Sequence, residues 1–448
     1  MKKRMLLLLL LPLIVITLPK HSYAAGNLQS LIDGTKEGGV IHLENKTYEG
    51  NIVIDKTIDI IGKKGTVIKG DGTGNVISIR APHVTIKNLT VTHSSLNRNS
   101  PEEFAAIKVY TDYNVIDSVA INHFFHGIYL SQAHHNTITN AHITGQGKGI
   151  IAKQGNGLHI YYSNDNTLKN NMVEGTRDGM FFDYANGNQI INNQISETRY
   201  GLHYMYSDNN YFEGNTFTFN TGGAAIMHSR GIQLENNEFI FNYGHKSFGL
   251  LLLSASDTLI EENTFFLNQR GLYIDQATDT IIKNNRILKN QIGIELWASS
   301  NNQLFTLNEI EENTIPAVTL GGQGSSNQWS DQGKGNYWGK TFPVLDLNQD
   351  GIGDQPVSYQ SSLYELIEDQ ELTYLFLKSP AISIYEKMNQ MFNHDKTMFK
   401  DPSPIVKNGG SHARKMLFVL AAAAIIAIIF IKGRHQLCII FGRNGRKT

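Results

Sequence analysis

Three consecutive segments of 22 residues, each beginning with glycine, read GLHIYYSNDNTLKNNMVEGTRD (157–178), GMFFDYANGNQIINNQISETRY (179–200) and GLHYMYSDNNYFEGNTFTFNTG (201–222). The same ladder continues at Gly223 and, after one gap of 26 residues, at Gly249, Gly271 and Gly293. A fixed period of this size is typical of stacked supersecondary units. The chain is therefore predicted to be a solenoid.

Short strands follow these glycines. The runs LHIYY after Gly157 and LHYMY after Gly201 have apolar residues at their first and third positions, and they are too short for helices. Asparagines recur at the same spacing, at Asn171, Asn193 and Asn215, where they can hydrogen-bond along a stack of identical neighbours. Strands cornered by Gly and Asn and stacked about 4.8 Å apart form a parallel β-helix. We expect the right-handed form, which is the usual hand of parallel β connections.

This all-β solenoid is predicted to be one long domain. Residues 26–330 would supply roughly thirteen coils at about 22 residues per coil, because a solenoid grows by adding coils. A closing cap segment with an Asp- and Asn-rich turn is expected at 331–360. Residues 361–413 then read as one or two amphipathic helices that lead the chain to a membrane.

Both ends of the chain indicate export and anchoring. Residues 1–25 combine Lys2, Lys3 and Arg4 with an apolar core and the small residues of SYAA, which is typical of a signal peptide. Residues 414–434 contain sixteen unbroken apolar residues flanked by Lys and Arg, which predicts one transmembrane helix. The basic segment 435–448 favours a cytoplasmic tail. We therefore expect a single-pass protein of the cell membrane with its β-helix on the extracytoplasmic side.

Charge and cysteine usage exclude several functions. A net charge of −1 and a pI of about 7.0 give no sign of a nucleic-acid groove, so nucleic acid is not an expected partner. The one cysteine, Cys438, lies in the predicted tail. The exported part thus has no thiol for disulfides, for cysteine-based redox chemistry or for cysteine ligation of a metal.

The period breaks at one corner of the predicted coil. Insertions fall within 144–156 and 243–248, in both cases just before the glycine. Insertions at one corner become loops on one side of a solenoid, which is often the binding side. The two loops would bracket four coils.

These four coils carry unusual side chains at outward positions. Positions one and three after each glycine are apolar and should face the core, so positions two and four should face out. His203 and Met205 would then share a face, with Met227 on the next rung, and such soft ligands suit Cu(I). The candidate copper residues are His159, Asp183, His203, Met205, Met227 and His228.

Two other readings of this surface stay open. Met and aromatic side chains on an outer face also make an adaptable protein docking surface. A register slip of one residue would turn all of these side chains into the core.

A second group of histidines shows no matched spacing and reads as solvated surface; it comprises His123, His126, His134, His135 and His142.

A separate motif lies in the cap segment. Asp346, Asn348, Asp350 and Asp354 place oxygen donors around Gly351, which is the pattern of a calcium loop. The bidentate Glu expected at the twelfth position is missing, and Val357 stands there. Calcium binding and an Asx-rich cap turn are both compatible with this motif.

Several stretches together resemble the NosD family of copper-processing proteins for nitrous oxide reductase maturation. They are GGVIHLENKTYEGNIVIDKTIDIIG, the 22-residue Asn/Gly coils, GNYWGK…DLNQDGIGDQPVSY, and LFLKSPAISIYEKMNQMF…KDPSP. The resemblance implies a β-helix mounted on an ABC transporter, with an ATPase and a permease, that receives copper from a lipoprotein chaperone and serves nitrous oxide reductase. The chain departs from the family in GNYWGK, where GNYWSD is common, and in its C-terminal anchor.

The competing interpretation is a polysaccharide lyase, epimerase or hydrolase, because this fold often hosts carbohydrate chemistry. Such enzymes need clustered carboxylates beside a base in a groove. Asp178, Asp183, Arg177 and Arg199 are the nearest candidates, but Asp178 is expected at a corner and no second carboxylate shares the column of Asp183. A surface scaffold or adhesin is a third interpretation, which predicts no metal uptake.

Overall fold

The computed structural model describes residues 28–147, 151–244, 246–322, 326–392 and 396–407. The chain divides into two compact units between Leu259 and Ile260. The predicted signal peptide (1–25), transmembrane helix (414–434) and basic tail (435–448) lie outside the described residues. Among the helices of the described part, none is long and apolar enough to cross a membrane.

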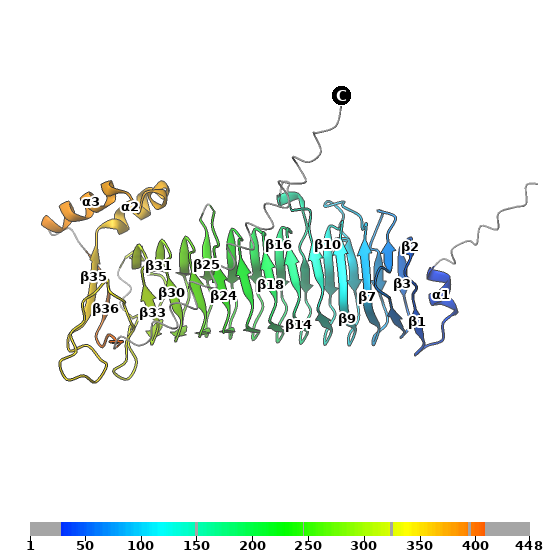
Figure 1. Cartoon of the computed structure of the whole chain (residues 1–448), viewed down its shortest axis with the longest axis horizontal. Helices are drawn as coiled ribbons and strands as arrows, with labels where there is room; N and C mark the ends of the chain where they lie inside the picture. Colours follow the sequence, from blue (N-terminus) through cyan, green and yellow to red (C-terminus); the bar gives the residue numbers. More distant parts are fainter. Residues whose placement is uncertain (1–27, 148–150, 245, 323–325, 393–395, 408–448) are drawn as a thin grey trace, which may run out of the picture. The chain divides into compact units, whose positions relative to one another are not determined.

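The first unit is a right-handed parallel β-solenoid of about 22 residues per coil, preceded by helix α1 (Leu28–Gly34) (Figure 1). One wall has a single strand per coil: β3 (Ile52–Ile54), β6 (Ile77–Ile79), β8 (Ala105–Val109), β10 (His126–Ser131), β13 (Leu158–Tyr161), β16 (Asp178–Asp183), β19 (Tyr200–Met205), β22 (Gly222–Met227) and β25 (Phe248–Leu253). Helix α1 was not predicted, since the coils were expected to start at residue 26.

Shorter strands form the rest of each coil. In the first unit they are β1 (Val40–His42), β2 (Thr47–Glu49), β4 (Asp59–Ile61), β5 (Val67–Lys69), β7 (Thr85–Thr92), β9 (Val115–Asn122), β11 (Thr137–Thr139), β12 (His142–Thr144), β14 (Thr167–Lys169), β15 (Met172–Glu174), β17 (Gln189–Ile191), β18 (Gln194–Ser196), β20 (Tyr211–Glu213), β21 (Thr216–Thr218), β23 (Gln233–Glu235) and β24 (Glu238–Ile240). Strand β26 (Leu259–Glu261) spans the division between the units.

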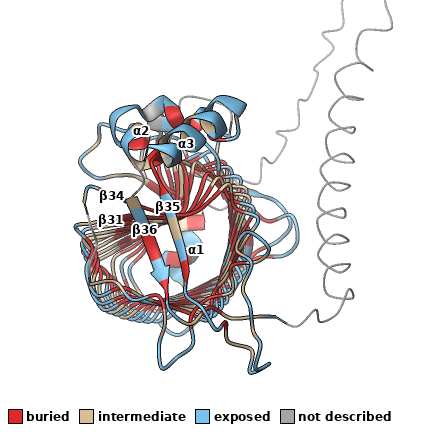
Figure 2. Cartoon of the chain, turned by 90° about the vertical axis from the view of Figure 1, so that its left-hand side faces the viewer, coloured by how far each residue is buried: buried red, intermediate tan, exposed pale blue. Residues whose placement is uncertain are grey.

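The predicted register is confirmed. The residues expected to face inward, at positions one and three, are all fully buried: Leu158, Met180, Leu202, Ala224, Ile160, Phe182, Tyr204 and Ile226. In Figure 2, buried residues (red) recur along the strands of the coils. Burying apolar side chains contributes about 25 cal/mol per Å², so this continuous column is the main stabilising element of the solenoid.

Apart from Gly157, which directly precedes β13, the ladder glycines lie within strands, and their interpretation as corners was wrong. A Cβ on Gly179 would stand 2.2 Å from a methyl of Ile195 and 2.7 Å from the carbonyl oxygen of Gly201. Glycine is therefore required because two backbones and a core side chain approach closely. The corners are formed instead by residues with left-handed backbone, such as Tyr184 (φ 50°) and Glu197 (φ 56°).

Both predicted insertions are present. A third insertion, which was not predicted, lies earlier in the chain. Ile128 pairs with Leu158 on the next coil, so the chain between them contains the insertion before β13. This insertion includes a short 3₁₀ helix, η1 (Ile151–Lys153). The step from Ala224 to Leu250 covers the insertion before β25. A further step, from Ile77 to Ile107, covers the unpredicted loop 94–104 before β8.

The second unit continues the same strand pattern and ends in a cap. Its strands are β27 (Thr264–Phe266), β28 (Arg270–Asp275), β29 (Ile281–Lys283), β30 (Arg286–Leu288), β31 (Ile292–Trp297), β32 (Leu304–Thr306), β33 (Glu309–Glu311) and β34 (Ile315–Leu320). The cap contains β35 (Val357–Ser361), α2 (Leu363–Asp369), η2 (Glu371–Leu375), α3 (Pro380–Met391) and β36 (Lys396–Asp401).

Helices are confirmed in 361–392, but the last part of the segment predicted as helical is strand. β36 pairs antiparallel with β35, and its Phe399 stacks on Trp338 at 4.1 Å. The Asp401 carboxylate accepts hydrogen bonds from the indole N–H of Trp338 (2.8 Å) and the backbone N–H of Asn336 (2.7 Å). Long-range pairing with β35 thus overrides the local helical pattern.

Candidate metal centre

The outward side of β13, β16, β19 and β22 carries the candidate copper residues, and we call it the outer face. Strand pairing aligns His159 with Phe181, His203 and Ala225 in one column, and Tyr161 with Asp183, Met205 and Met227 in the next. Both predicted columns are confirmed. A third column, which the sequence analysis missed, runs through Asp178 and Tyr200, because β16 and β19 start before the ladder glycine.

Asp178 and His203 meet across two neighbouring coils. The Asp178 side chain is 1% exposed, and its Oδ2 lies 3.0 Å from His203 Nδ1. Arg199 donates to both oxygens of this carboxylate, from Nε at 2.8 Å and from Nη2 at 2.6 Å. The expectation that Asp178 occupies a corner away from the strand face is therefore wrong.

Hydrogen bonding decides the charge state of Asp178. Burial alone would raise the pKa of its carboxyl group, but the hydrogen bonds from His203 and Arg199 outweigh burial and hold the pKa below its usual value. An ionised carboxylate only accepts hydrogen bonds, so Nδ1 must donate where it bonds to Asp178, although the Arg199 Nη2 donor also lies 3.1 Å from Nδ1. Nε2 of a neutral His203 then has its lone pair available for a ligand.

Met205, Met227 and Asp183 complete the predicted set beside His203. The two methionines are register partners on adjacent strands and are half-buried. Adjacent strands lie about 4.8 Å apart, and residues two apart on one strand about 7 Å, so both thioethers are within side-chain reach of His203. Burial raises the pKa of Asp183, the charge of His203 opposes that shift, and the charge of Glu103 adds to it.

His159 faces outward as predicted, but aromatic rings cover it. Its ring stacks on Tyr129 at 4.2 Å and meets the edge of Phe181 at 4.8 Å, which leaves the residue 5% exposed. Burial holds its pKa well below the ordinary value, with smaller effects from His126 and Lys108. Its Nδ1 lies 3.4 Å from the Asn156 amide nitrogen, a donor, which favours a proton on Nε2. His203, whose side chain is 13% exposed, is therefore the more accessible of the two histidines.

His228 lies at the bend after β22, in an exposed ladder of aromatic rings. Tyr162, Tyr184, Tyr206 and His228 stack in sequence with centroid separations of 4.7, 5.2 and 5.0 Å. Gln132 has the same left-handed conformation at the corresponding corner of an earlier coil, so the turn itself does not demand a ring. Because the rings cover one another, the ladder presents ring edges to the solvent.

The unpredicted loop 94–104 folds onto the neighbouring strands. Glu102 accepts hydrogen bonds from the buried ammonium group of Lys108, through its backbone carbonyl and its carboxylate. Glu103 Oε2 accepts a hydrogen bond of 2.9 Å from the hydroxyl of Tyr129, which in turn stacks on His159. The extra eight or so residues between the coils of β6 and β8 were the sequence signal for this loop.

Residues 147–341 match the family model described as "Periplasmic copper-binding protein (NosD)". A segment of 134 residues is 28% identical to the probable ABC transporter binding protein NosD of Pseudomonas aeruginosa, and it covers 30% of this chain and 31% of that relative. The chain is a NosD-like protein. The matched residues 147–341 include the whole outer face.

Solved structures share the solenoid of this NosD-like chain. A periplasmic alginate epimerase AlgG is 14% identical, with 70% of this chain and 83% of that chain covered and a TM-score of 0.52. The Dettilon tailspike protein is 12% identical, with 65% and 63% covered and a TM-score of 0.50. At these identities the likeness shows the fold alone.

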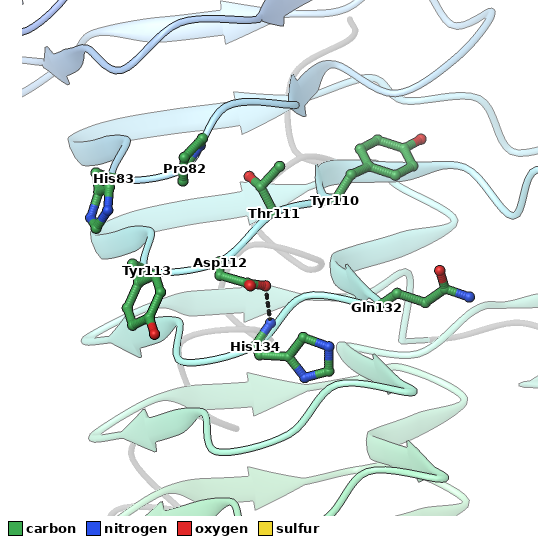
Figure 3. Close-up of a pocket in the computed structure, with 8 residues that line it drawn as sticks. All are labelled: Pro82, His83, Tyr110, Thr111, Asp112, Tyr113, Gln132 and His134. Carbon is green, nitrogen blue, oxygen red and sulfur yellow. Dashed lines mark hydrogen bonds between the residues drawn. The ribbon is translucent and has the colours of Figure 1, made fainter.

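The second histidine group of the NosD-like chain is dispersed. His134 lines a shallow pocket with His83, Asp112 and Tyr113, where Asp112 accepts the backbone N–H of His134 at 2.7 Å (Figure 3). His123 stacks on His93, while His126 is buried with its Nε2 unpartnered within the described residues. Nowhere in the described part do three His, Cys, Asp or Glu side chains gather as a metal site requires.

The Asp-rich turn of the NosD-like chain is held by its own backbone. Asp346 accepts the N–H groups of Asp350 (3.2 Å) and Gly351 (3.0 Å), and Asp354 accepts that of Leu347 (2.6 Å). Asn348 likewise accepts the Asp350 N–H at 3.1 Å. These are the contacts of an Asx-rich turn. Calcium binding at this turn stays a prediction.

Proposed function

We propose that this chain is an extracytoplasmic copper-handling protein that binds Cu(I) on its outer face through His203, Met205 and Met227. The observation that supports the proposal is that His203, whose Nδ1 contacts Asp178, lies two residues from Met205 on β19, and Met205 pairs with Met227 on the next strand. Asp183 shares the column of Met205 and Met227, His159 shares the column of His203, and His228 directly follows Met227.

The chemistry of the donors favours Cu(I) over harder ions. Thioether sulfur binds soft metals, whereas calcium and magnesium prefer oxygen. Two thioethers and one imidazole form a neutral donor set, and no cysteine precedes Cys438. Such a site suits a cargo ion that is received and passed on, because it lacks the thiolates that hold copper most tightly.

The partners follow from the NosD likeness. We propose that the solenoid works with the ATPase and permease of an ABC transporter, receives copper from a lipoprotein chaperone, and serves the maturation of nitrous oxide reductase. The predicted signal peptide and transmembrane segment would keep the chain at the outside of the cell membrane. Co-purification with the transporter subunits tests this assignment, and a chain that never associates with them would contradict it.

Cu(I) titration of the purified chain against a chromophoric chelator tests the binding itself. We expect uptake of one equivalent under reducing conditions, with no comparable uptake of Zn²⁺. Absence of Cu(I) uptake would reject copper binding by the chain alone. The predicted calcium turn is tested separately by the melting temperature, which should rise with added Ca²⁺ in the wild type and not in an Asp346→Ala variant if the ion binds there.

One observation favours a second function, an enzyme acting on polysaccharides. Asp178, Arg199 and His203 place a buried carboxylate, a cation and an imidazole on one strand face, and Asp183 is a carboxylate whose pKa burial raises. These are the groups that acid–base chemistry on a sugar ring needs. Incubation with uronate-containing polysaccharides distinguishes the two functions, since the copper proposal predicts no turnover.

A further inference from the structure

We propose that Asp178 is the positioning residue of His203: its carboxylate holds the proton on Nδ1 and thereby keeps Nε2 free for Cu(I). This inference rests on the proposed function, and nothing in the likeness to NosD assigns a role to Asp178. It concerns a buried carboxylate on the first strand position of β16 that acts through the histidine on β19.

His203 Nδ1 has two polar neighbours, Asp178 Oδ2 at 3.0 Å and Arg199 Nη2 at 3.1 Å. Both oxygens of Asp178 accept from Arg199, at 2.8 and 2.6 Å, so the carboxylate is a fixed acceptor. Nη2 already donates to Oδ2 at 2.6 Å, so the charged carboxylate is the stronger partner and favours a proton on Nδ1. The imidazole ring is further held by the edge contact with Phe181 at 4.8 Å. These contacts hold the orientation of the ring before any metal arrives, and the carboxylate favours the tautomer with Nε2 unprotonated.

The solenoid does not require a carboxylate at this position. The register partners of Asp178 on the following coils are Tyr200 and Gly222, neither of which carries a charge. Burying a carboxylate is costly unless it is paired. Asp178 is nevertheless a carboxylate, and it contacts His203 on the outer face. This indicates that Asp178 has a role beyond packing.

A second buried ion pair in the chain supplies a matched comparison. Arg270 and Glu295 in the second unit are 5% and 1% exposed, and Arg270 Nε lies 2.7 Å from Glu295 Oε2. There the third partner is the hydroxyl of Tyr374, at 2.8 Å, where Asp178 has an imidazole. Neutralising either carboxylate disturbs a buried pair, but only Asp178 controls a histidine.

The first test reads the tautomer of His203 without metal. In the wild type labelled with ¹⁵N-histidine, and with the signal assigned through a His203→Gln variant, Nδ1 should carry the proton. In Asp178→Asn the amide group can donate to Nδ1, so the proton should move to Nε2. A wild-type His203 protonated on Nε2, or an unchanged tautomer in Asp178→Asn, would overturn the positioning role.

The second test measures Cu(I) affinity by chelator competition. Losing the partner of a metal-bound histidine typically costs about 10- to 100-fold in affinity, so we expect a weakening of this size in Asp178→Asn. The control Glu295→Gln should bind as the wild type does. Equal affinity of wild type and Asp178→Asn overturns this inference while leaving the proposed function intact, whereas a wild type without Cu(I) uptake rejects the proposed function itself.

Discussion

The buried asparagine ladder should determine the stability of the coils, and Asn193 tests it. Its Oδ1 accepts hydrogen bonds from the backbone N–H and the side-chain amide of Asn171, both at 2.9 Å. Its own amide donates to the carbonyl of Leu168 and to Asn215 Oδ1, also at 2.9 Å. Both Asn171 and Asn193 are no more than 1% exposed. An Asn193→Ala substitution removes all four bonds.

The cost can be worked out from what remains. The Asn171 amide keeps its bond to Ile138, and Asn215 Oδ1 still accepts the backbone N–H of residue 193. The Asn171 backbone N–H, however, loses the acceptor that Asn193 provided, and an unsatisfied buried donor costs about 1–3 kcal/mol. The other three bonds contribute roughly 0.5–1 kcal/mol each. We therefore expect a total destabilisation of about 2.5–6 kcal/mol.

Guanidinium unfolding followed by circular dichroism measures this loss. The control is Gln194→Ala, because Gln194 is the adjacent residue and is exposed, and surface changes of this kind stay within about 0.5 kcal/mol. Hydrogen exchange of the coils around β18 should be followed in parallel, since solenoid coils can open locally. An Asn193→Ala variant as stable as Gln194→Ala would refute the reasoning.

Three further outcomes are expected. Burial, with the charges of Lys108 and Arg177, lowers the pKa of His126 to about 3, so the folded state excludes a proton that the unfolded state binds below about pH 6.5. Stability should thus fall as the pH drops from 6.5 towards 3, and His126→Asn should make that fall less steep; identical pH profiles would contradict this. Tyr374→Phe should cost about 2 kcal/mol, because a hydrogen bond to the carboxylate of Glu295 is lost, and should speed hydrogen exchange in α2 and η2. Replacing Lys108 by methionine should release loop 94–104, which limited proteolysis would show as faster cleavage near Glu102.

The repeat could be recognised from the sequence because each coil places chemically equivalent residues at equivalent positions. The alternation after each glycine correctly separated the core residue Tyr204 from the outward residues His203 and Met205. The side of the coil that carries the loops was also readable, since the insertions before β13 and β25 interrupt the period.

Side-chain contacts between coils could not be predicted from the sequence in the same way. Asp178 was placed at a corner because glycine was taken as the corner residue, whereas the glycine lies inside β16 and the strand starts one residue earlier. The burial of His159 depends on Tyr129, 30 residues earlier, whose ring covers it. Strand β36 was missed because its partner β35 is distant in the sequence. Each of these features arises from packing that no local pattern encodes.

The most direct test of the central claim is the Cu(I) affinity of the wild type compared with His203→Ala, Met205→Ala and Met227→Ala. His135→Ala serves as the control, because His135 stacks on Tyr113 in a different ladder of the same unit. The account predicts weaker Cu(I) binding in each of the three outer-face variants and wild-type binding in the control. Equal Cu(I) uptake in the wild type and all three variants would contradict it.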